Sequence, residues 1–138
     1  MALENSRIAF IGSGVMAEAM IRGLLDTNLL NGDRIVVSDP RKERGQELVA
    51  RYNLHYAHDN AEAARGADII VLSTKPQVMG QVAKSLDGEG SKASLVLSIL
   101  AGVRIRTIAD ALGKPNPPLV VGIIGPNWAR HYGMDGDR

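Results

Sequence analysis

The 138-residue sequence contains no cysteine, which excludes disulfide bonds, thiolate zinc sites and cysteine nucleophiles. Aromatic residues make up only 4 % of the sequence, so a hydrophobic core must consist mainly of aliphatic side chains. The apolar stretches are short, and none approaches the roughly 20 residues that a membrane-spanning helix needs. The first residues place Glu4 ahead of a short apolar run, which is not the pattern of a secretory signal. From these absences we expect a cytoplasmic protein.

Neither sign of charge is in clear excess. Lys and Arg together number 16 and Asp and Glu 15, giving a net charge of +1. This balance argues against nucleic acid or an anionic membrane as the main partner. The histidines His55, His58 and His131 have no regular ligand spacing and no accompanying carboxylate pair, so we expect no metal site. The length fits one globular domain of about 100–200 residues.

Short apolar runs alternate with segments of helical periodicity along most of the chain. Apolar runs that are buried on both faces are typical of parallel sheets, whose strands are joined by helical crossovers. We therefore expect a doubly wound α/β fold with a mostly parallel sheet of about six strands, covering residues 1–125, and an irregular tail over residues 126–138. Asn60 is expected to cap a brief helix, and Met16, Met20 and Met79 to fill gaps in the core. The pattern predicts strands over residues 7–11, 34–38, 55–57, 68–73, 95–100 and 119–124, and helices over residues 15–25, 41–52, 60–64, 77–86 and 104–112.

A glycine-rich turn, Gly12-Ser13-Gly14-Val15-Met16-Ala17, joins the first predicted strand to the first predicted helix. In such a turn Gly12 permits the sharp bend, Gly14 lets a diphosphate approach the backbone, and Ala17 lets the helix lie close to the strand. The helix N-terminus offers free N–H groups and a partial positive charge to the phosphates. The context favours a Rossmann-type dinucleotide site. The alternative is a glycine turn that serves only close packing of the helix.

Asp39 follows the second predicted strand and is succeeded by Pro40, Arg41 and Lys42. A carboxylate at this place can accept both hydroxyls of the adenosine ribose and repels a 2′-phosphate, which favours NAD. The guanidinium of Arg41 favours NADP instead, because it can bind a 2′-phosphate through two hydrogen bonds. The charged residues from 41 to 47 can also be read as a solvated helix face. The choice between NADH and NADPH therefore stays open.

Polar and small residues follow two further predicted strands. Ser73-Thr74-Lys75-Pro76 stands at the carboxyl end of the fourth strand, where ligands of open parallel sheets bind. Lys75 at this place can meet a phosphate, a ribose or a substrate carboxylate, or it can simply face solvent. Ile99-Leu100-Ala101-Gly102 ends the next strand at the same crevice, and Asn60 is expected on its adenosine side.

These segments together resemble the pyrroline-5-carboxylate reductases, which reduce Δ1-pyrroline-5-carboxylate to L-proline with NADPH or NADH. The resemblance rests on Ile8-Ala-Phe-Ile-Gly-Ser-Gly-Val-Met-Ala17, Leu72-Ser-Thr-Lys-Pro-Gln77, Ser98-Ile-Leu-Ala-Gly-Val103 and Pro126-Asn127, and it covers most of residues 7–127. It implies an oxidoreductase that transfers a hydride to a ring C=N carbon. The cofactor supplies the reducing power, and the protein supplies orientation and a polar site.

The resemblance also assigns site residues. Lys75 and Asn127 become the substrate-side candidates, and no catalytic residue is assigned. Asp39 takes the position of a ribose or 2′-phosphate contact, and Asn60 that of an adenosine contact. The cofactor-binding residues that we predict are Ile11, Gly12, Ser13, Gly14, Val15 and Met16 around the diphosphate, Asp39, Arg41 and Asn60 around the adenosine, and Ser73, Thr74, Lys75, Pro76, Ile99, Leu100 and Ala101 around the nicotinamide half.

Two departures from the family pattern stand at the carboxyl end. The family continues Pro-Asn-Thr-Pro, whereas Trp128 and Ala129 follow Asn127 here. The family also has a helical domain after the cofactor domain, which forms the dimer and much of the substrate site, and the sequence does not contain it. We therefore expect a chain incomplete for catalysis that self-associates through surface left uncovered. Two other readings are a non-catalytic dinucleotide-binding module and the cofactor domain of a related imine or hydroxyacid reductase.

Overall fold

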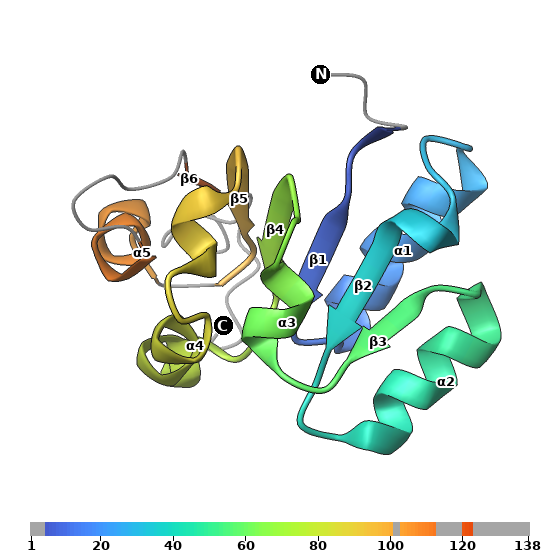
Figure 1. The fold of residues 1–138 in the computed structure, drawn as a ribbon, viewed down its shortest axis with the longest axis horizontal. Coiled ribbons are helices and arrows are strands. Elements are labelled where there is room, and N and C mark those ends of the chain that lie inside the picture. Colours follow the sequence, from blue (N-terminus) through green and yellow to red (C-terminus); the bar gives the residue numbers. More distant parts are fainter. Residues whose placement is uncertain (1–4, 101–102, 113–119, 123–138) are drawn as a thin grey trace, which may run out of the picture.

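The computed structural model describes residues 5–100, 103–112 and 120–122. Within this part the chain forms a parallel sheet of six strands with the order β3-β2-β1-β4-β5-β6. The predicted doubly wound α/β fold is confirmed (Figure 1). The strands are β1 (Ile8–Ile11), β2 (Ile35–Ser38), β3 (His55–Ala57), β4 (Ile69–Leu72), β5 (Leu95–Ser98) and β6 (Val120–Gly122); the α-helices are α1 (Val15–Asp26), α2 (Lys42–Tyr52), α3 (Asn60–Ala64), α4 (Met79–Ser85) and α5 (Ile105–Leu112); and the 3₁₀ helices are η2 (Gly32–Arg34), η3 (Pro76–Val78) and η4 (Glu89–Lys92).

Alternate residues of each strand enter two separate cores, one on each face of the sheet. In β1, Ala9 and Ile11 face a core that α3, α4 and α5 complete, whereas Ile8 and Phe10 face a core completed by α1 and α2. This period of two follows from the pleat of the strand. All four residues of β1 and of β4 are buried, as expected for the two central strands. The core is aliphatic apart from Phe10 among its largest buried side chains.

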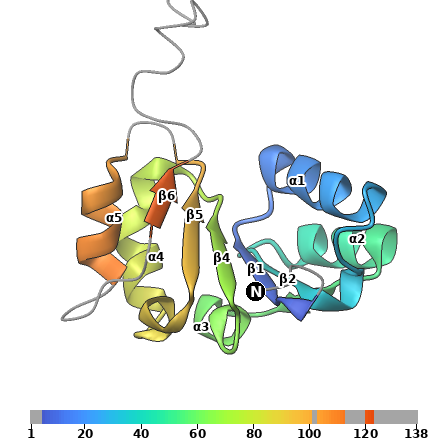
Figure 2. The same cartoon turned by 90° about the horizontal axis from the view of Figure 1, so that it is seen from above.

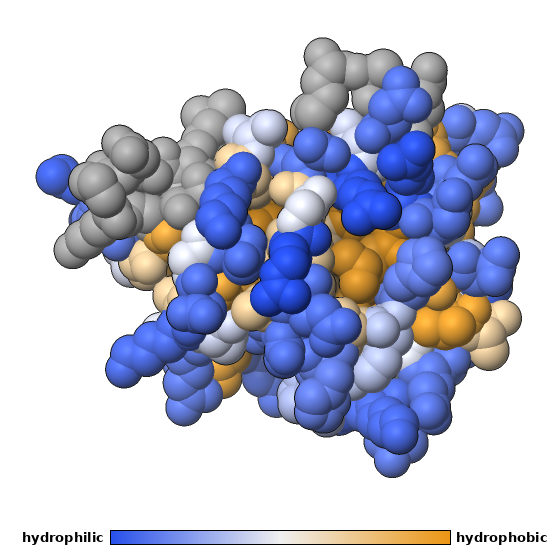
Figure 3. Space-filling view, viewed as in Figure 1, coloured by the Kyte–Doolittle hydropathy of each residue, from blue (hydrophilic) through white to orange (hydrophobic). Residues whose placement is uncertain are grey.

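The helices cover both faces of the sheet: α1 and α2 pack on one face, and α3, α4 and α5 pack on the other. Figures 1 and 2 show α1 and α2 beside β1, β2 and β3, and α4 and α5 beside β4, β5 and β6. On the α1–α2 side of the sheet, Leu95 and Leu97 of β5 are only half-buried, and Val121 of β6 is exposed. The face drawn in Figure 3 is mostly hydrophilic, with apolar residues visible in strips between the polar ones.

Some local predictions are wrong in detail. Asp59, not Asn60, caps α3, because its side chain accepts a hydrogen bond from the backbone N–H of Glu62 at 2.7 Å. The segment predicted as one helix from residue 77 begins with the short 3₁₀ helix η3, and a second short 3₁₀ helix, η4, lies between α4 and β5. Met16 is exposed rather than in the core, because it follows the turn at the open end of α1. The predicted tail over residues 126–138 lies outside the described residues.

Candidate functional site

A cleft of about 800 Å³ opens at the carboxyl ends of the strands. Parallel strands turn into helices there, so the loops after β1, β2, β3 and β4 meet at one edge of the sheet. The residues that line it are Gly12, Ser13, Gly14, Ser38, Asp39, Pro40, Arg41, His58, Asp59, Asn60, Ser73, Thr74, Lys75, Val78, Gln81, Val82 and Ser85. Nine of the predicted cofactor-binding residues are thus brought together in one cleft: Gly12, Ser13, Gly14, Asp39, Arg41, Asn60, Ser73, Thr74 and Lys75.

The glycine turn bends at Gly12, whose φ of +92° lies in the region that favours glycine. A Cβ atom at Gly12 would lie 2.8 Å from the backbone oxygen of Ser73, so the position admits no side chain. The N–H of Gly12 donates to the carbonyl of Ser38 at 2.9 Å, and the hydroxyl of Ser73 donates to the carbonyl of Gly12 at 2.6 Å. The turn is therefore fixed to the ends of both neighbouring strands.

Gly14 differs from Gly12, because it needs no unusual backbone conformation. Its φ is −79°, and no heavy atom lies within 4 Å of the place where its Cβ would stand. Gly14 is the N-cap residue of α1 and contributes no side-chain hydrogen bond to the helix. The next two side chains point outward, with Val15 83 % and Met16 51 % exposed. The first-turn amides of α1, which lack intrahelical acceptors, therefore begin at an open position beside the cleft.

The carboxylate of Asp39 is buried and bonded through both oxygens. Its Oδ2 accepts hydrogen bonds from the backbone N–H of Ser13 at 3.1 Å and from the Ser13 hydroxyl at 2.7 Å. Arg41 donates to Oδ1 from its backbone N–H at 2.8 Å and from Nε at 2.9 Å, and to Oδ2 from Nη2 at 3.1 Å. Burial alone would raise the pKa of Asp39, but the bonds from Arg41 and Ser13 outweigh it and hold the pKa at about 2. Asp39 is therefore an anion at neutral pH.

The remaining polar groups of the cleft fall into two sets. On the β2–α3 side, the Oδ1 atom of Asn60 accepts from the hydroxyl of Ser38 at 2.5 Å, and its Nδ2 atom donates to Ser85 at 2.8 Å. After β4, the hydroxyl oxygen of Thr74 is buried without a hydrogen-bond partner, and Lys75 is exposed. A buried hydroxyl without a partner is uncommon, so Thr74 marks a place where a ligand atom can complete the bonding.

Comparison with known proteins shows the family to which the chain belongs. Residues 7–102 match the model of the family described as NADP oxidoreductase coenzyme F420-dependent. The chain belongs to this family. The match includes the glycine turn, Asp39, Arg41, Asn60 and the segment after β4, so every strand that shapes the cleft lies within it.

The chain is similar to several individual proteins that are named as pyrroline-5-carboxylate or pyrroline carboxylate reductases. The pyrroline-5-carboxylate reductase of Methanosarcina acetivorans is 36 % identical over 110 residues, which are 80 % of this chain and 41 % of the relative. The structure of a pyrroline-5-carboxylate reductase from Coxiella burnetii has a TM-score of 0.77 and 30 % identity, covering 85 % of this chain and 43 % of the other. The structure of Plasmodium falciparum pyrroline carboxylate reductase with NADP bound has a TM-score of 0.73 and 28 % identity, covering 88 % and 43 %. The predicted resemblance is confirmed, and the chain spans less than half the length of these relatives.

Several predicted site residues do not line the cleft with their side chains. Ile11 is fully buried in the core and Leu100 nearly so, which leaves only their backbone for a ligand. Val15 and Met16 lie beside the cleft at the start of α1. Ala101 and Asn127 lie outside the described residues, and of Pro76 only the backbone, in η3, is described.

Sequence reasoning missed other residues of the site. Arg44 donates hydrogen bonds to the carbonyl of Ser13 at 2.7 Å and to that of Gly14 at 3.4 Å. The sequence assigned it no role beyond that of a solvated helix face over residues 41 to 47. His58, which the sequence did not assign to the site, lines the cleft, as do Gln81 and Ser85. A polar residue directly after β3, facing the same edge as Asp39, was the one available signal for His58.

In the part of the chain that the structure describes, no group of three or more His, Asp or Glu residues could hold a metal ion. No helix of that part is long and apolar enough to cross a membrane.

A second cleft of about 290 Å³, lined by Arg7, Arg34 and Arg65 among others, lies at the opposite, amino-terminal edge of the sheet.

Proposed function

We propose that this chain is the cofactor-binding part of a pyrroline-5-carboxylate reductase and that it binds NADPH or NADH in the cleft at the carboxyl ends of the strands. The observation that carries the proposal is the glycine turn. Gly12 is locked in its bend, whereas Gly14 leaves open space where a Cβ would stand, directly at the first turn of α1. A diphosphate requires this combination of a rigid turn and an unobstructed helix N-terminus.

Other features of the cleft fit a dinucleotide. A volume of about 800 Å³ is within the range of cofactor sites, roughly 300–1,000 Å³. Arg41 lies at the β2 end, where the adenosine ribose binds in folds of this kind. The unpartnered hydroxyl of Thr74 and the exposed ammonium group of Lys75 lie after β4, on the nicotinamide side. The similarity to a relative whose structure holds NADP supports the same assignment.

Such a cofactor, when bound, supplies a hydride for reduction of a C=N bond. This chain's residues bind and orient it. The first-turn amides of α1 receive the diphosphate, Ser73 keeps the turn in place through the carbonyl of Gly12, and Asp39 stays negatively charged beneath the turn. Lys75, and Asn127 outside the described residues, are our candidates for holding the carboxylate of the substrate.

The side chain of Arg41 favours NADPH over NADH in this proposal. Its side chain is 63 % exposed although Asp39 holds the guanidinium in place, so it can reach a 2′-phosphate without leaving the cleft edge. Asp39 itself is engaged through both carboxylate oxygens and is a poor acceptor for ribose hydroxyls. Self-association and a cytoplasmic location remain predictions.

The experiment is a titration of the 138-residue chain with NADPH and with NADH, followed by the fluorescence of the reduced nicotinamide. We expect saturable binding of NADPH well below 1 mM. The matched variant Gly14→Val places a branched side chain where the diphosphate must approach, and it should abolish binding while circular dichroism shows an unchanged fold. Absence of binding of either dinucleotide to the wild-type chain at millimolar concentration would overturn the proposal.

Proline-linked turnover separates the reductase reading from a non-catalytic binding module. The chain is supplied with the helical domain of a pyrroline-5-carboxylate reductase, either fused or in trans, and NADPH oxidation is followed with Δ1-pyrroline-5-carboxylate present. The proposal expects substrate-dependent oxidation that Gly14→Val removes. Cofactor binding without any turnover in a fusion that folds would favour the binding module instead.

A further inference from the structure

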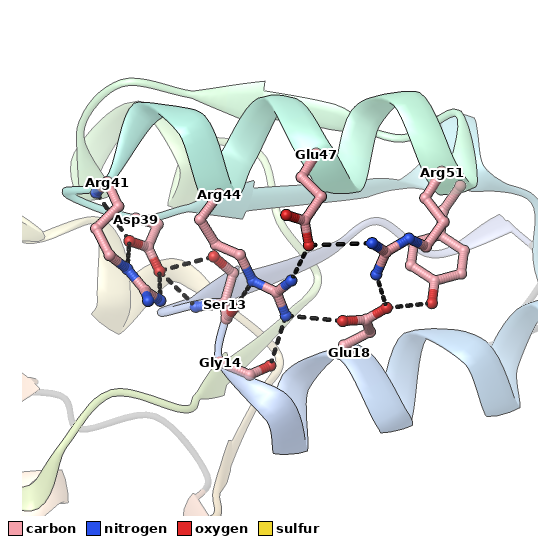
Figure 4. Close-up of polar contacts among 9 residues, drawn as sticks. Ser13, Gly14, Glu18, Asp39, Arg41, Arg44, Glu47 and Arg51 are labelled. Atoms are coloured by element: carbon pink, nitrogen blue, oxygen red, sulfur yellow. Dashed lines mark hydrogen bonds and ion pairs between the residues drawn. The ribbon is translucent and has the colours of Figure 1, made fainter.

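Two side chains of opposite charge hold the glycine turn from outside it. Asp39, in the loop after β2, accepts the N–H and the hydroxyl of Ser13. Arg44, in the first half of α2, donates from Nε to the carbonyl of Ser13 at 2.7 Å and from Nη2 to the carbonyl of Gly14 at 3.4 Å. The N–H of Ser13 and the carbonyls of Ser13 and Gly14 are therefore bonded by residues 26 to 31 positions away (Figure 4).

These bonds decide which amides of the turn are available to a ligand. The N–H of Ser13 is committed to Asp39. In a planar trans peptide the C=O and the N–H point in opposite directions. Because Arg44 binds the carbonyls of Ser13 and Gly14, it directs the N–H groups of Gly14 and Val15 away from α2. The donors left for an anion are these two amides and the later first-turn amides of α1.

Arg44 is itself held in one place. Its Nη2 atom donates to Glu18 of α1 at 2.8 Å and its Nη1 atom to Glu47 of α2 at 2.6 Å. Arg51 and Tyr52, from the last turn of α2, bind Glu18 as well, each at 2.5 Å. Figure 4 shows the guanidinium groups of Arg44 and Arg51 lying between the two helices and reaching toward the Glu18 carboxylate.

The charges of this network alternate, so Arg44 adds little net positive potential for a distant anion. Two carboxylates, Glu18 and Glu47, each bind both guanidinium groups. The hydrogen bond from Tyr52, and then the bond from Arg44, lower the pKa of Glu18 to about 2, so it remains charged at neutral pH. The side chain of Arg44 is only 16 % exposed, and it does not line the cleft. Its effect on a bound anion must therefore come through the geometry of the turn.

We propose that Arg44 and Asp39 are positioning residues that hold the Ser13–Gly14 peptide in the conformation that binds the diphosphate. The assignment rests on the proposed dinucleotide function of the cleft. It adds that this conformation is set by the α2 side of the fold before any ligand arrives. A ligand then finds a preorganised turn and does not have to order it.

The test compares Arg44→Met and Arg44→Lys with the control Arg51→Met. Arg51 binds the same Glu18 from the same helix but is not bonded to the turn. Dissociation constants for NADPH are measured by nicotinamide fluorescence, and the amide signals of Gly14 and Val15 are followed by nuclear magnetic resonance without ligand. We expect Arg44→Met to weaken NADPH binding about tenfold, since two hydrogen bonds from a charged donor are lost, and Arg51→Met to change it less than twofold.

Arg44→Lys provides the conservative rescue. A lysine can donate to one carbonyl but cannot span two in the fixed geometry of a guanidinium, so its dissociation constant should fall between those of wild type and Arg44→Met. The Gly14 and Val15 amide signals should move in both Arg44 variants before ligand is added, and not in Arg51→Met. This readout separates a positioning role from a general loss of stability.

The outcomes separate this inference from the function on which it rests. If the wild-type chain binds no dinucleotide, the proposed function fails. If the wild type binds NADPH but Arg44→Met and Arg51→Met bind it equally well, the positioning role of Arg44 is overturned and the function stands. If Arg44→Met does not fold, Arg44→Lys decides, since wild-type affinity with unmoved Gly14 and Val15 signals contradicts the inference.

Discussion

The hydroxyl of Ser13 donates to Oδ2 of Asp39 at 2.7 Å, across 26 positions of sequence. This bond joins the turn after β1 to the loop after β2 at the point where the two neighbouring strands end. Both groups are buried. Asp39, which the sequence predicts as a ribose contact, is thus part of the support of the glycine turn, and this difference has measurable consequences.

The first consequence is an acid dependence of stability. The pKa of Asp39 is about 2 in the folded protein, against an ordinary value of 3.8. A lowered pKa means that the charged form favours folding, so the contribution is complete above about pH 4 and is lost as the pH falls through 2. The shift corresponds to about 2 kcal/mol. Glu18, whose pKa falls from 4.5 to about 2, adds stability that is lost between about pH 5 and pH 2.

Urea unfolding at pH 7, 4, 3 and 2.5 measures this dependence. Asp39→Asn should lower the free energy of unfolding at pH 7 and flatten its decline between pH 4 and pH 2. Asp26→Asn, at the exposed last residue of α1, is the control and should follow the wild-type curve. A wild-type slope retained in Asp39→Asn would contradict the role given to this carboxylate.

Substitution by alanine should destabilise the protein at Gly12 but not at Gly14. At Gly12 a Cβ would meet the backbone oxygen of Ser73 at 2.8 Å and the φ is +92°, so Gly12→Ala should cost about 2 kcal/mol or more of folding stability. Gly14→Ala should change stability by less than about 0.5 kcal/mol, because the place of its Cβ is open. Thermal unfolding of both variants checks this, and equal losses would show that the geometry of the turn is misassigned.

A glycine inside α2 should also prove intolerant of alanine. A Cβ at Gly45 would overlap the ring of Tyr56, whose hydroxyl donates to the backbone carbonyl of Asp39 at 2.9 Å. Gly45→Ala should therefore destabilise the protein by about 1–3 kcal/mol, although alanine is the better helix former.

Gly23 of α1 is the matched control for Gly45. No heavy atom lies within 4 Å of its Cβ position, so Gly23→Ala should stabilise the protein by about 0.5–1 kcal/mol. Both values come from denaturant midpoints measured under the same conditions. A stabilising Gly45→Ala would mean that Tyr56 does not pack on this position.

Replacement of Arg41 should change cofactor preference rather than cofactor binding in general. Arg41→Ala should weaken NADPH binding about tenfold or more, since a charge-assisted contact to a phosphate is lost, and should alter NADH binding little. Lys42→Ala, at the next residue and outside the cleft lining, should leave both affinities unchanged. Equal weakening of both cofactors by Arg41→Ala would place this side chain away from the 2′-phosphate.

Much of the fold follows from local pattern. Apolar runs closed by glycine or a polar residue predicted β1, β2, β4, β5 and β6, because strand burial in a parallel sheet is visible in composition. The short strand β3 was also predicted, although His55 is exposed and only Ala57 is buried. The N-cap of α3 was misplaced by one residue, at Asn60 instead of Asp59, since Asp and Asn both cap well and only the backbone geometry decides between them.

The sequence predicted where the candidate site lies, but not which hydrogen bonds its residues make. Gly12, Gly14, Asn60 and Thr74 could be placed at one sheet edge because parallel strands end together. The engagement of Asp39 by Ser13 and Arg41 could not be foreseen, because a carboxylate at the end of β2 looks the same whether its oxygens face solvent or a buried hydroxyl. Arg44 was missed for a similar reason: in a charged helix, only the crossing of α1 and α2 shows which arginine turns inward.

The central claim is that the amides at the start of α1 bind a diphosphate. A crystal of the 138-residue chain soaked with NADPH tests it most directly. We expect density for the diphosphate within hydrogen-bond distance of the amides from Gly14 to Met16, with the adenosine toward Arg41 and Asn60. NADPH bound at the Arg7–Arg34 cleft, or a turn filled by a protein side chain with the dinucleotide elsewhere, would contradict it.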